Sequence, residues 1–230
     1  MLLLTMPLRG VAKSRFELAR FDASAPERSG RLGGISLGAP LWEAEFSLSR
    51  AATAELEDEW SSFLGRLRGQ AIPFLAWDRL RIYPRAHGSG FRTMTRPDGS
   101  AFDGSATDWS QTIDANGEAQ LTLTGLPAGL RLNPRDYCGF RWDAEGADAG
   151  TFERRHMVRV EVGGKADATG EITVTIEPAV PELVPEGAVA HLDRPSCVMR
   201  AKPGSIDFGI SDESGDRIGG KFAALQDLRP

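Results

Sequence analysis

The sequence predicts a mainly β protein, a β-sandwich or barrel, with one amphipathic α-helix near residues 53–68. Two observations support this fold class. Only one segment repeats its apolar residues with the helical period, whereas most other apolar segments alternate with a period of two. In the second half of the chain, short alternating segments are separated by turn signals, which is typical of sandwiches and barrels.

The predicted helix has one apolar face, formed by Leu56, Trp60, Phe63, Leu64 and Leu67. Glu55 and its acidic neighbours lie in the first turns and Arg66 in the last, an arrangement that complements the helix dipole. Ser49 or Thr53 is the expected N-cap, and Gly69 is the expected C-terminal glycine. We expect the five apolar side chains to form a structural core against a sheet.

Strands are expected on both sides of this helix. Residues 41–48 alternate between apolar and polar side chains, as a half-buried strand does. Residues 72–77 and 80–83 are also predicted to be strands. The stretch 84–108 is rich in Gly, Pro, Ser, Thr and Asp, so it is predicted to be a long loop or linker.

The second half of the chain has the pattern of a strand-rich domain. Strands are predicted at 121–124, 138–142, 158–162, 172–176, 189–192 and 197–200. We therefore expect residues 1–100 to form a β-sandwich with the helix and residues 101–202 to form a second β-barrel or sandwich. Residues 203–230 are rich in Gly and Asp, and an irregular C-terminal extension is predicted there.

Charge and hydropathy exclude several classes of protein. The 230 residues carry 27 basic and 32 acidic side chains, a net charge of −5, so sequence-specific nucleic-acid binding is not expected. Apolar runs are too short to cross a bilayer, and the first residues lack the basic start of a signal peptide. We expect no membrane partner, and we expect the chain to be made in a bacterial cytoplasm.

Few residues have a spacing that indicates chemistry. Cys138 and Cys197 are too few for a disulfide framework or a cysteine-based zinc site, and both are expected to be buried as free thiols. His87, His156 and His191 are not at metal-ligand spacing, although His156 and His191 could meet across paired strands. We therefore expect no metal and no cofactor.

Three short motifs resemble functional loops but lack their context. Residues 34–38 match the G-x-S-x-G pattern around Ser36, yet a strand follows instead of the helix that a nucleophile elbow requires, so a loop is predicted there. Residues 212–216 lack the glycine and the final glutamate of a calcium loop, and residues 88–90 lack the third glycine of a dinucleotide fingerprint. We expect no catalytic residue; an esterase activity lost on Ser36→Ala would contradict this.

Several longer stretches carry a family resemblance. In the first half, Leu48-Ser49-Arg50 precedes the acidic helix, and residues 67–70 then lead into Pro73-Phe74-Leu75-Ala76-Trp77-Asp78. In the second half the stretches are 126–129, 132–137 and 166–170. Together they resemble tail-tip proteins of long-tailed bacteriophages and gene transfer agents, especially the distal tail family.

The resemblance implies a structural role in a virion tail. Distal tail proteins form a ring beneath the tail tube, so it implies a homohexamer with the tube protein above and a hub or baseplate protein below. It implies no enzymatic activity. An acidic chain also suits a channel through which DNA slides, and we expect acidic loops to face the lumen. A tail-tube or baseplate hub protein is the near alternative.

A second alternative comes from a different class of protein. A β-sandwich with exposed aromatic side chains could bind host glycans. In that case Trp109, Trp142 and the loop 143–151 would form the binding face. Glycan binding that is lost on Trp142→Ala would support this alternative.

Overall fold

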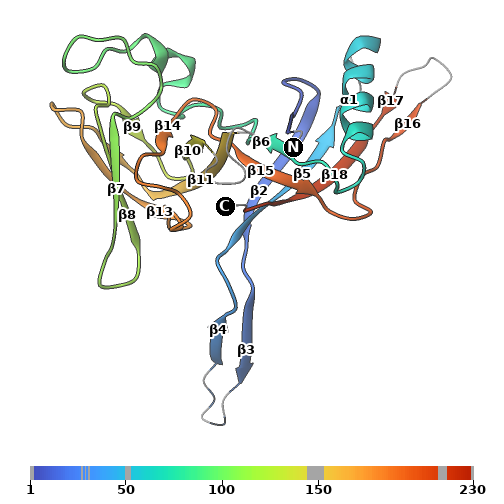
Figure 1. Cartoon of the computed structure of the whole chain (residues 1–230), viewed down its shortest axis with the longest axis horizontal. Helices are drawn as coiled ribbons and strands as arrows, with labels where there is room; N and C mark the ends of the chain where they lie inside the picture. The colour runs from blue at the N-terminus through green and yellow to red at the C-terminus, as the bar shows by residue number, and fades with distance from the viewer. Residues whose placement is uncertain are drawn as a thin grey trace.

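The structure is a computed structural model that describes residues 3–26, 28, 30, 32–49, 53–143, 153–211 and 217–228. The fold is mainly β, as predicted, with one α-helix in the described part. Two six-stranded sheets lie at opposite ends of an elongated body, and a two-stranded ribbon projects from between them (Figure 1). No helix in the described ranges is long and apolar enough to span a membrane.

The first sheet takes its strands from both ends of the chain, in the order β1-β6-β15-β18-β5-β2. Its strands are β1 (Leu4–Thr5), β2 (Val11–Ala19), β5 (Leu41–Leu48), β6 (Phe74–Ala76), β15 (Cys197–Ala201) and β18 (Gly220–Gln226). Helix α1 (Ala54–Arg66) packs on one face of this sheet. We call the sheet and its helix the first lobe.

Helix α1 forms where its periodicity predicts it. The Thr53 side chain caps the N-terminus by accepting a hydrogen bond from the Leu56 amide. Trp60, Phe63, Leu64 and Leu67 are buried in the first core, with Leu56 packed at its edge, as the spacing indicates. The chain leaves the helix through two residues with positive φ, Arg68 at 48° and Gly69 at 69°, so the left-handed turn begins one residue before the expected glycine.

The predicted irregular C-terminal extension is wrong for residues 220–226. Strand β18 lies inside the first sheet between β15 and β5, with Phe222 and Ala224 buried. Three of its seven residues are glycine or alanine, so the local alternation is weak, and the pairing with β15 and β5 forms the strand. Because β15 also pairs with β6, the expected domain boundaries at residues 100 and 202 do not match the lobes.

The second lobe is a six-stranded antiparallel sheet with the order β14-β10-β11-β13-β8-β7. Its strands are β7 (Asp108–Ile113), β8 (Ala119–Thr124), β10 (Tyr137–Asp143), β11 (Glu153–Val162), β13 (Ile172–Glu177) and β14 (Val189–His191). The Ala106 amide donates to the Ala190 carbonyl at 2.8 Å, which brings the chain before β7 against β14. The two edges of the sheet therefore meet at one end, and the lobe approaches a barrel. The short strands β9 (Arg131–Leu132) and β12 (Gly164–Lys165) pair beside it.

Residues 80–108 differ from their prediction. Residues 80–83 form no strand, and the stretch expected to be a linker contains a 3₁₀ helix, η1 (Gly88–Thr93). Phe91 and Phe102 from this stretch are buried in the core of the second lobe. The stretch therefore covers that core, since two buried aromatic side chains hold it there.

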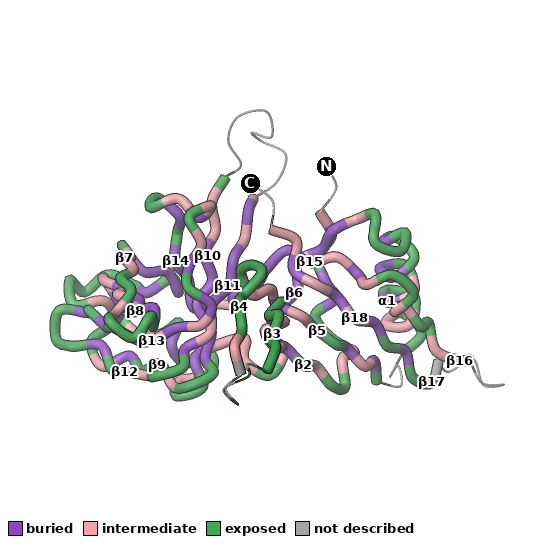
Figure 2. The backbone as a smooth tube through the Cα atoms, turned by 90° about the horizontal axis from the view of Figure 1, so that it is seen from below, coloured by how far each residue is buried: buried purple, intermediate pink, exposed green. Residues whose placement is uncertain are grey.

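Two ribbons extend from the body. Strands β16 (Ile210–Ser211) and β17 (Arg217–Ile218) pair beyond helix α1, and residues 212–216, which resemble a calcium loop, lie outside the described residues. Strands β3 (Asp22–Pro26) and β4 (Leu32–Ser36) pair in the second ribbon, which leaves the body between the lobes (Figure 1). Figure 2 shows buried positions concentrated within the two lobes and exposed positions along this second ribbon.

Candidate assembly site

The ribbon β3–β4 continues strands of the first sheet into solvent. Strand β2 leads into β3 and strand β4 leads into β5, and the Leu37 amide donates to the Phe21 carbonyl at 2.7 Å. We call residues 21–37 the arm. All five residues of β3 are exposed, so the described part of the arm extends away from the body (Figure 1).

The arm is amphipathic. Residues directly opposite in an antiparallel pair share a face, and here Ala23 lies opposite Ile35 and Ala25 opposite Gly33. One face therefore contains Phe21, Ala23, Ala25, Gly33, Ile35 and Leu37, and the other contains Asp22, Ser24, Pro26, Gly34 and Ser36. Phe21 is 43% exposed, and Ile35 and Leu37 are each 66% exposed. An isolated two-stranded ribbon is marginally stable in water, and a contiguous exposed apolar face indicates an interaction site.

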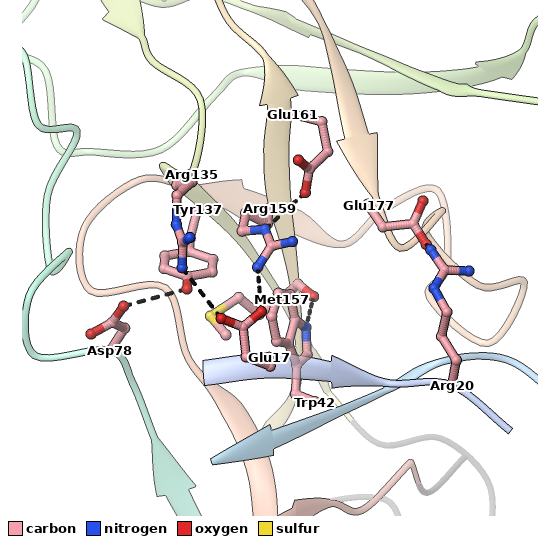
Figure 3. A network of polar contacts seen from close by, with 10 residues as sticks. All are labelled: Glu17, Arg20, Trp42, Asp78, Arg135, Tyr137, Met157, Arg159, Glu161 and Glu177. Atoms are coloured by element: carbon pink, nitrogen blue, oxygen red, sulfur yellow. Dashed lines mark hydrogen bonds and ion pairs between the residues drawn. The ribbon is translucent and has the colours of Figure 1, made fainter. Parts of the chain in front are cut away.

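A polar seam ties the base of the arm to the second lobe (Figure 3). Glu17 on β2 accepts hydrogen bonds from Arg159 on β11 at 3.3 Å and from Arg135 at 3.5 Å. The Arg159 guanidinium also pairs with Glu161 at 2.8 Å, and the guanidinium carbon Cζ lies 5.6 Å from the centre of a Trp42 ring. Because the arm continues β2, these contacts orient the arm relative to both lobes.

Three further contacts cross this seam (Figure 3). Arg20, the residue just before the arm, pairs with Glu177 on β13 at 2.7 Å. The buried Trp42 indole donates to the Met157 carbonyl at 2.6 Å. The Tyr137 hydroxyl donates to Asp78 at 3.3 Å, and burial together with this carboxylate raises the pKa of Tyr137 above its usual value, so the phenol stays protonated.

Loss of the Trp42 hydrogen bond should weaken the coupling between the lobes. Trp42→Phe leaves the buried Met157 carbonyl without its donor, and we expect a loss of about 1–3 kcal/mol in the free energy of unfolding. Urea unfolding measured by circular dichroism checks this loss. Trp109→Phe is the matched control, since its indole donates to Ala188 within the second lobe. If the two lobes unfolded at more widely separated urea concentrations in the Trp109→Phe variant than in the Trp42→Phe variant, the role of the seam would be contradicted.

The other sequence-selected residues do not form a reactive site in the described ranges. Ser36 lies on the exposed arm and donates to the Gly38 carbonyl at 3.0 Å, in a ribbon and not in the predicted loop. His156 and His191 lie on β11 and β14, and the residues described include no group of three or more side chains that could hold a metal. Cys138 and Cys197 are buried free thiols, as predicted, and burial raises the pKa of Cys138 to about 12.

The two tryptophans of the glycan alternative do not share one hollow. Trp109 lines a hollow between β7 and residues 180–186, whereas Trp142 lines a smaller one with Leu183 and Arg154. Both rings are only partly buried against the second core. Residues 144–151 of the expected binding loop lie outside the described residues. The structure therefore separates the aromatic pair that this alternative combined.

The chain matches no protein-family model and no curated protein. The arm is consequently the feature that carries the functional argument. Sequence reasoning missed it, although residues 21–25 and 33–37 each alternate with a period of two around a polar turn. That signal was weak because alanine and glycine fill half of the apolar face.

Proposed function

We propose that the protein is a structural subunit of a bacteriophage tail tip, a distal-tail-like ring that joins the tail tube to the baseplate or hub, with no enzymatic activity. The amphipathic arm supports this proposal most directly. Its apolar face is exposed in the single chain, and an exposed apolar face of this kind indicates a contact with a neighbouring molecule. The sequence resemblance supplies the tail-tip context.

A single arm favours a ring over a simple dimer. The arm is one surface of the molecule, and a neighbour that binds it with a different surface forms a head-to-tail contact. Such contacts close into a ring when the rotation between copies allows it. The seam at Glu17 and Arg159 supports closure of the ring. It fixes the direction of the arm, so each copy would be rotated by the same angle relative to its neighbour.

The net charge suits a channel for DNA. The chain carries a net charge of −5, and like-charge repulsion would keep DNA from adhering to an acidic lumen. We expect the faces around the lumen to be acidic. A ring with a strongly basic lumen would contradict this part of the proposal.

Replacement of the arm tests the assembly role. We expect the parent protein to form a closed ring of about six copies, whereas a variant with residues 21–37 replaced by Gly-Ser-Gly should be monomeric because the contact is gone. Light scattering with negative-stain images of the same fraction measures both. A circular dichroism spectrum that matches the spectrum of the parent is the control that both lobes of the variant are folded. A monomeric parent, or identical rings without the arm, would contradict the proposal, and long stacked tubes would favour the tail-tube alternative.

A further inference from the structure

We propose that the apolar face of the arm docks on the second lobe of the next copy, in the hollow beside strand β7. This inference rests on the proposed ring assembly and names the surface that the arm binds. The hollow, which we call the β7 groove, lies between β7 and residues 180–186 and has a volume of about 490 Å³. The partner is therefore a second copy of this chain.

Strand β7 lies at the edge of its sheet and faces the groove. It is the last strand in the sheet order and pairs with β8 alone among the named strands. On its other side, the Gln111 side chain accepts from the Val180 amide at 2.6 Å and donates to the Val180 carbonyl at 3.1 Å. The Trp109 indole also donates to the Ala188 carbonyl at 2.8 Å, so side chains and not a strand span this gap. An added strand is a known way to complete such an edge.

The groove and the arm match in length and character. Strand β7 has six residues and the arm strands β3 and β4 have five each, so a paired arm would cover most of the edge. Trp109, Val180 and Val184 line the groove, and Ile113 at the end of β7 is 56% exposed. These apolar groups suit Ile35 and its neighbours on the arm.

Nothing among the residues that the structure describes requires glycine at position 34 in strand β4. A Cβ at Gly34 would meet nothing closer than the Ala23 carbonyl oxygen at 3.6 Å, an ordinary contact, and the backbone there has no positive φ. Glycine in a strand interior costs about 0.5–1 kcal/mol relative to alanine. Such a glycine commonly marks a place where another backbone comes close. Gly34 therefore favours strand addition at β4.

A strand edge distinguishes the groove from the acidic face of helix α1. Asp108, Glu182 and Glu186 are exposed at the groove. On the arm, Arg28 is exposed in the turn and Asp22 is exposed near the base. Helix α1 also presents acidic side chains, beginning at Glu55, but it has no strand edge for the arm to extend. The groove combines apolar side chains with a strand edge, which suit the apolar face and the strands of the arm, and its acidic side chains suit Arg28 in the turn.

Cysteine cross-linking between separate copies tests the contact. A variant carrying Ile35→Cys on the arm is mixed with a variant carrying Ser110→Cys on β7, and the mixture is oxidised. Both native cysteines are fully buried, so they do not interfere. We expect a disulfide-linked heterodimer. The matched control pairs Ile35→Cys with Ser62→Cys on the exposed face of α1 and should give no band.

Two other cross-linking results would overturn the docking site. A band with the α1 control would place the arm on the first lobe of the neighbour. A band from Ile35→Cys alone would indicate that arms pair with arms. In either case the parent ring would still support the assembly role, whereas a monomeric parent would contradict that role itself.

Charge reversal and an apolar-face variant give a second, independent measurement. Glu182→Arg with Glu186→Arg should raise the subunit dissociation constant about 10-fold, and Arg28→Glu should restore much of that loss. Ile35→Asp should raise the dissociation constant about 100-fold, since a buried contact is lost, whereas Ser24→Asp on the polar face should not. Unchanged assembly in the groove variants, or glycan binding lost on Trp109→Ala with rings intact, would overturn the proposal.

Discussion

The Phe222→Ala variant is expected to lose about 3–5 kcal/mol in the free energy of unfolding, the usual cost of removing a large buried aromatic side chain. Phe222 on strand β18 is 2% exposed. Its ring stacks on Phe46 with centroids 4.8 Å apart and an interplanar angle of 23°. It also lies 6.0 Å from Phe74 and 6.1 Å from Trp60 on helix α1. The variant therefore leaves a cavity between the sheet and its helix.

Urea unfolding followed by circular dichroism measures this loss. Lys221→Ala is the matched control, because this neighbouring side chain is exposed and its removal should change stability by no more than about 0.5 kcal/mol. The pair of variants tests whether the C-terminal segment is part of the first core. A loss below about 1 kcal/mol for Phe222→Ala would show that the segment does not hold the lobe together.

The parts of the fold that the sequence predicts well are those with strong local periodicity. Helix α1 repeats apolar residues over four turns, and strand β5 alternates over eight residues with Trp42 and Phe46 on its buried face. In both elements the residues that determine the local structure also pack in the core. Local and tertiary preferences agree there, so a single sequence is enough to locate them.

The elements that sequence reasoning missed depend on partners far away in the chain. Strand β18 pairs with β5, about 180 residues earlier, and this pairing leaves no signal near Gly220–Gln226. Strand β15 was expected in the second domain, because its neighbours in sequence belong there, but it pairs with β6. A period-two pattern identifies a strand and its buried face, but not the strand beside it.

The candidate assembly site was hidden for a related reason. The seam joins Glu17 to Arg159, which are 142 residues apart, so no spacing in the sequence connects them. The arm has a regular pattern, but its apolar face is exposed and does not pack on either core of the described structure. Burial is the usual reason for an alternating pattern, and an exposed ribbon with that pattern becomes visible only in the folded structure.

Two buried histidines should make the protein sensitive to mild acid. Burial lowers the pKa of His156 to about 3. Burial, and then the nearby charges of Arg155 and Arg141, lower the pKa of His191 to about 3. His191 Nδ1 lies 3.1 Å from the Asp193 carbonyl and its Nε2 lies 3.3 Å from the Arg155 guanidinium. The neutral His191 ring satisfies both contacts, whereas a second proton, on Nε2, would face the positively charged Arg155 guanidinium.

The sign of the effect follows from the unfolded chain. Histidine has a pKa near 6.5 when unfolded, so below that pH the unfolded state binds protons that the folded state excludes. Stability is therefore full above pH 6.5 and falls as the pH drops toward 3. At pH 5 each buried histidine should reduce the free energy of unfolding by about 2 kcal/mol. His87, whose pKa is lowered mainly by burial, acts in the same direction.

Urea unfolding at pH 7 and pH 5 measures this loss, and most carboxylates stay ionised over that range. We expect the parent to lose about 4 kcal/mol in total, and a His156→Gln, His191→Gln double variant to lose far less, because glutamine does not titrate. Equal stability of the parent at both pH values would show that protons reach both rings in the folded state. Since His156 contacts Gln226 on β18, acid should weaken the contact between the two lobes as well as the second core.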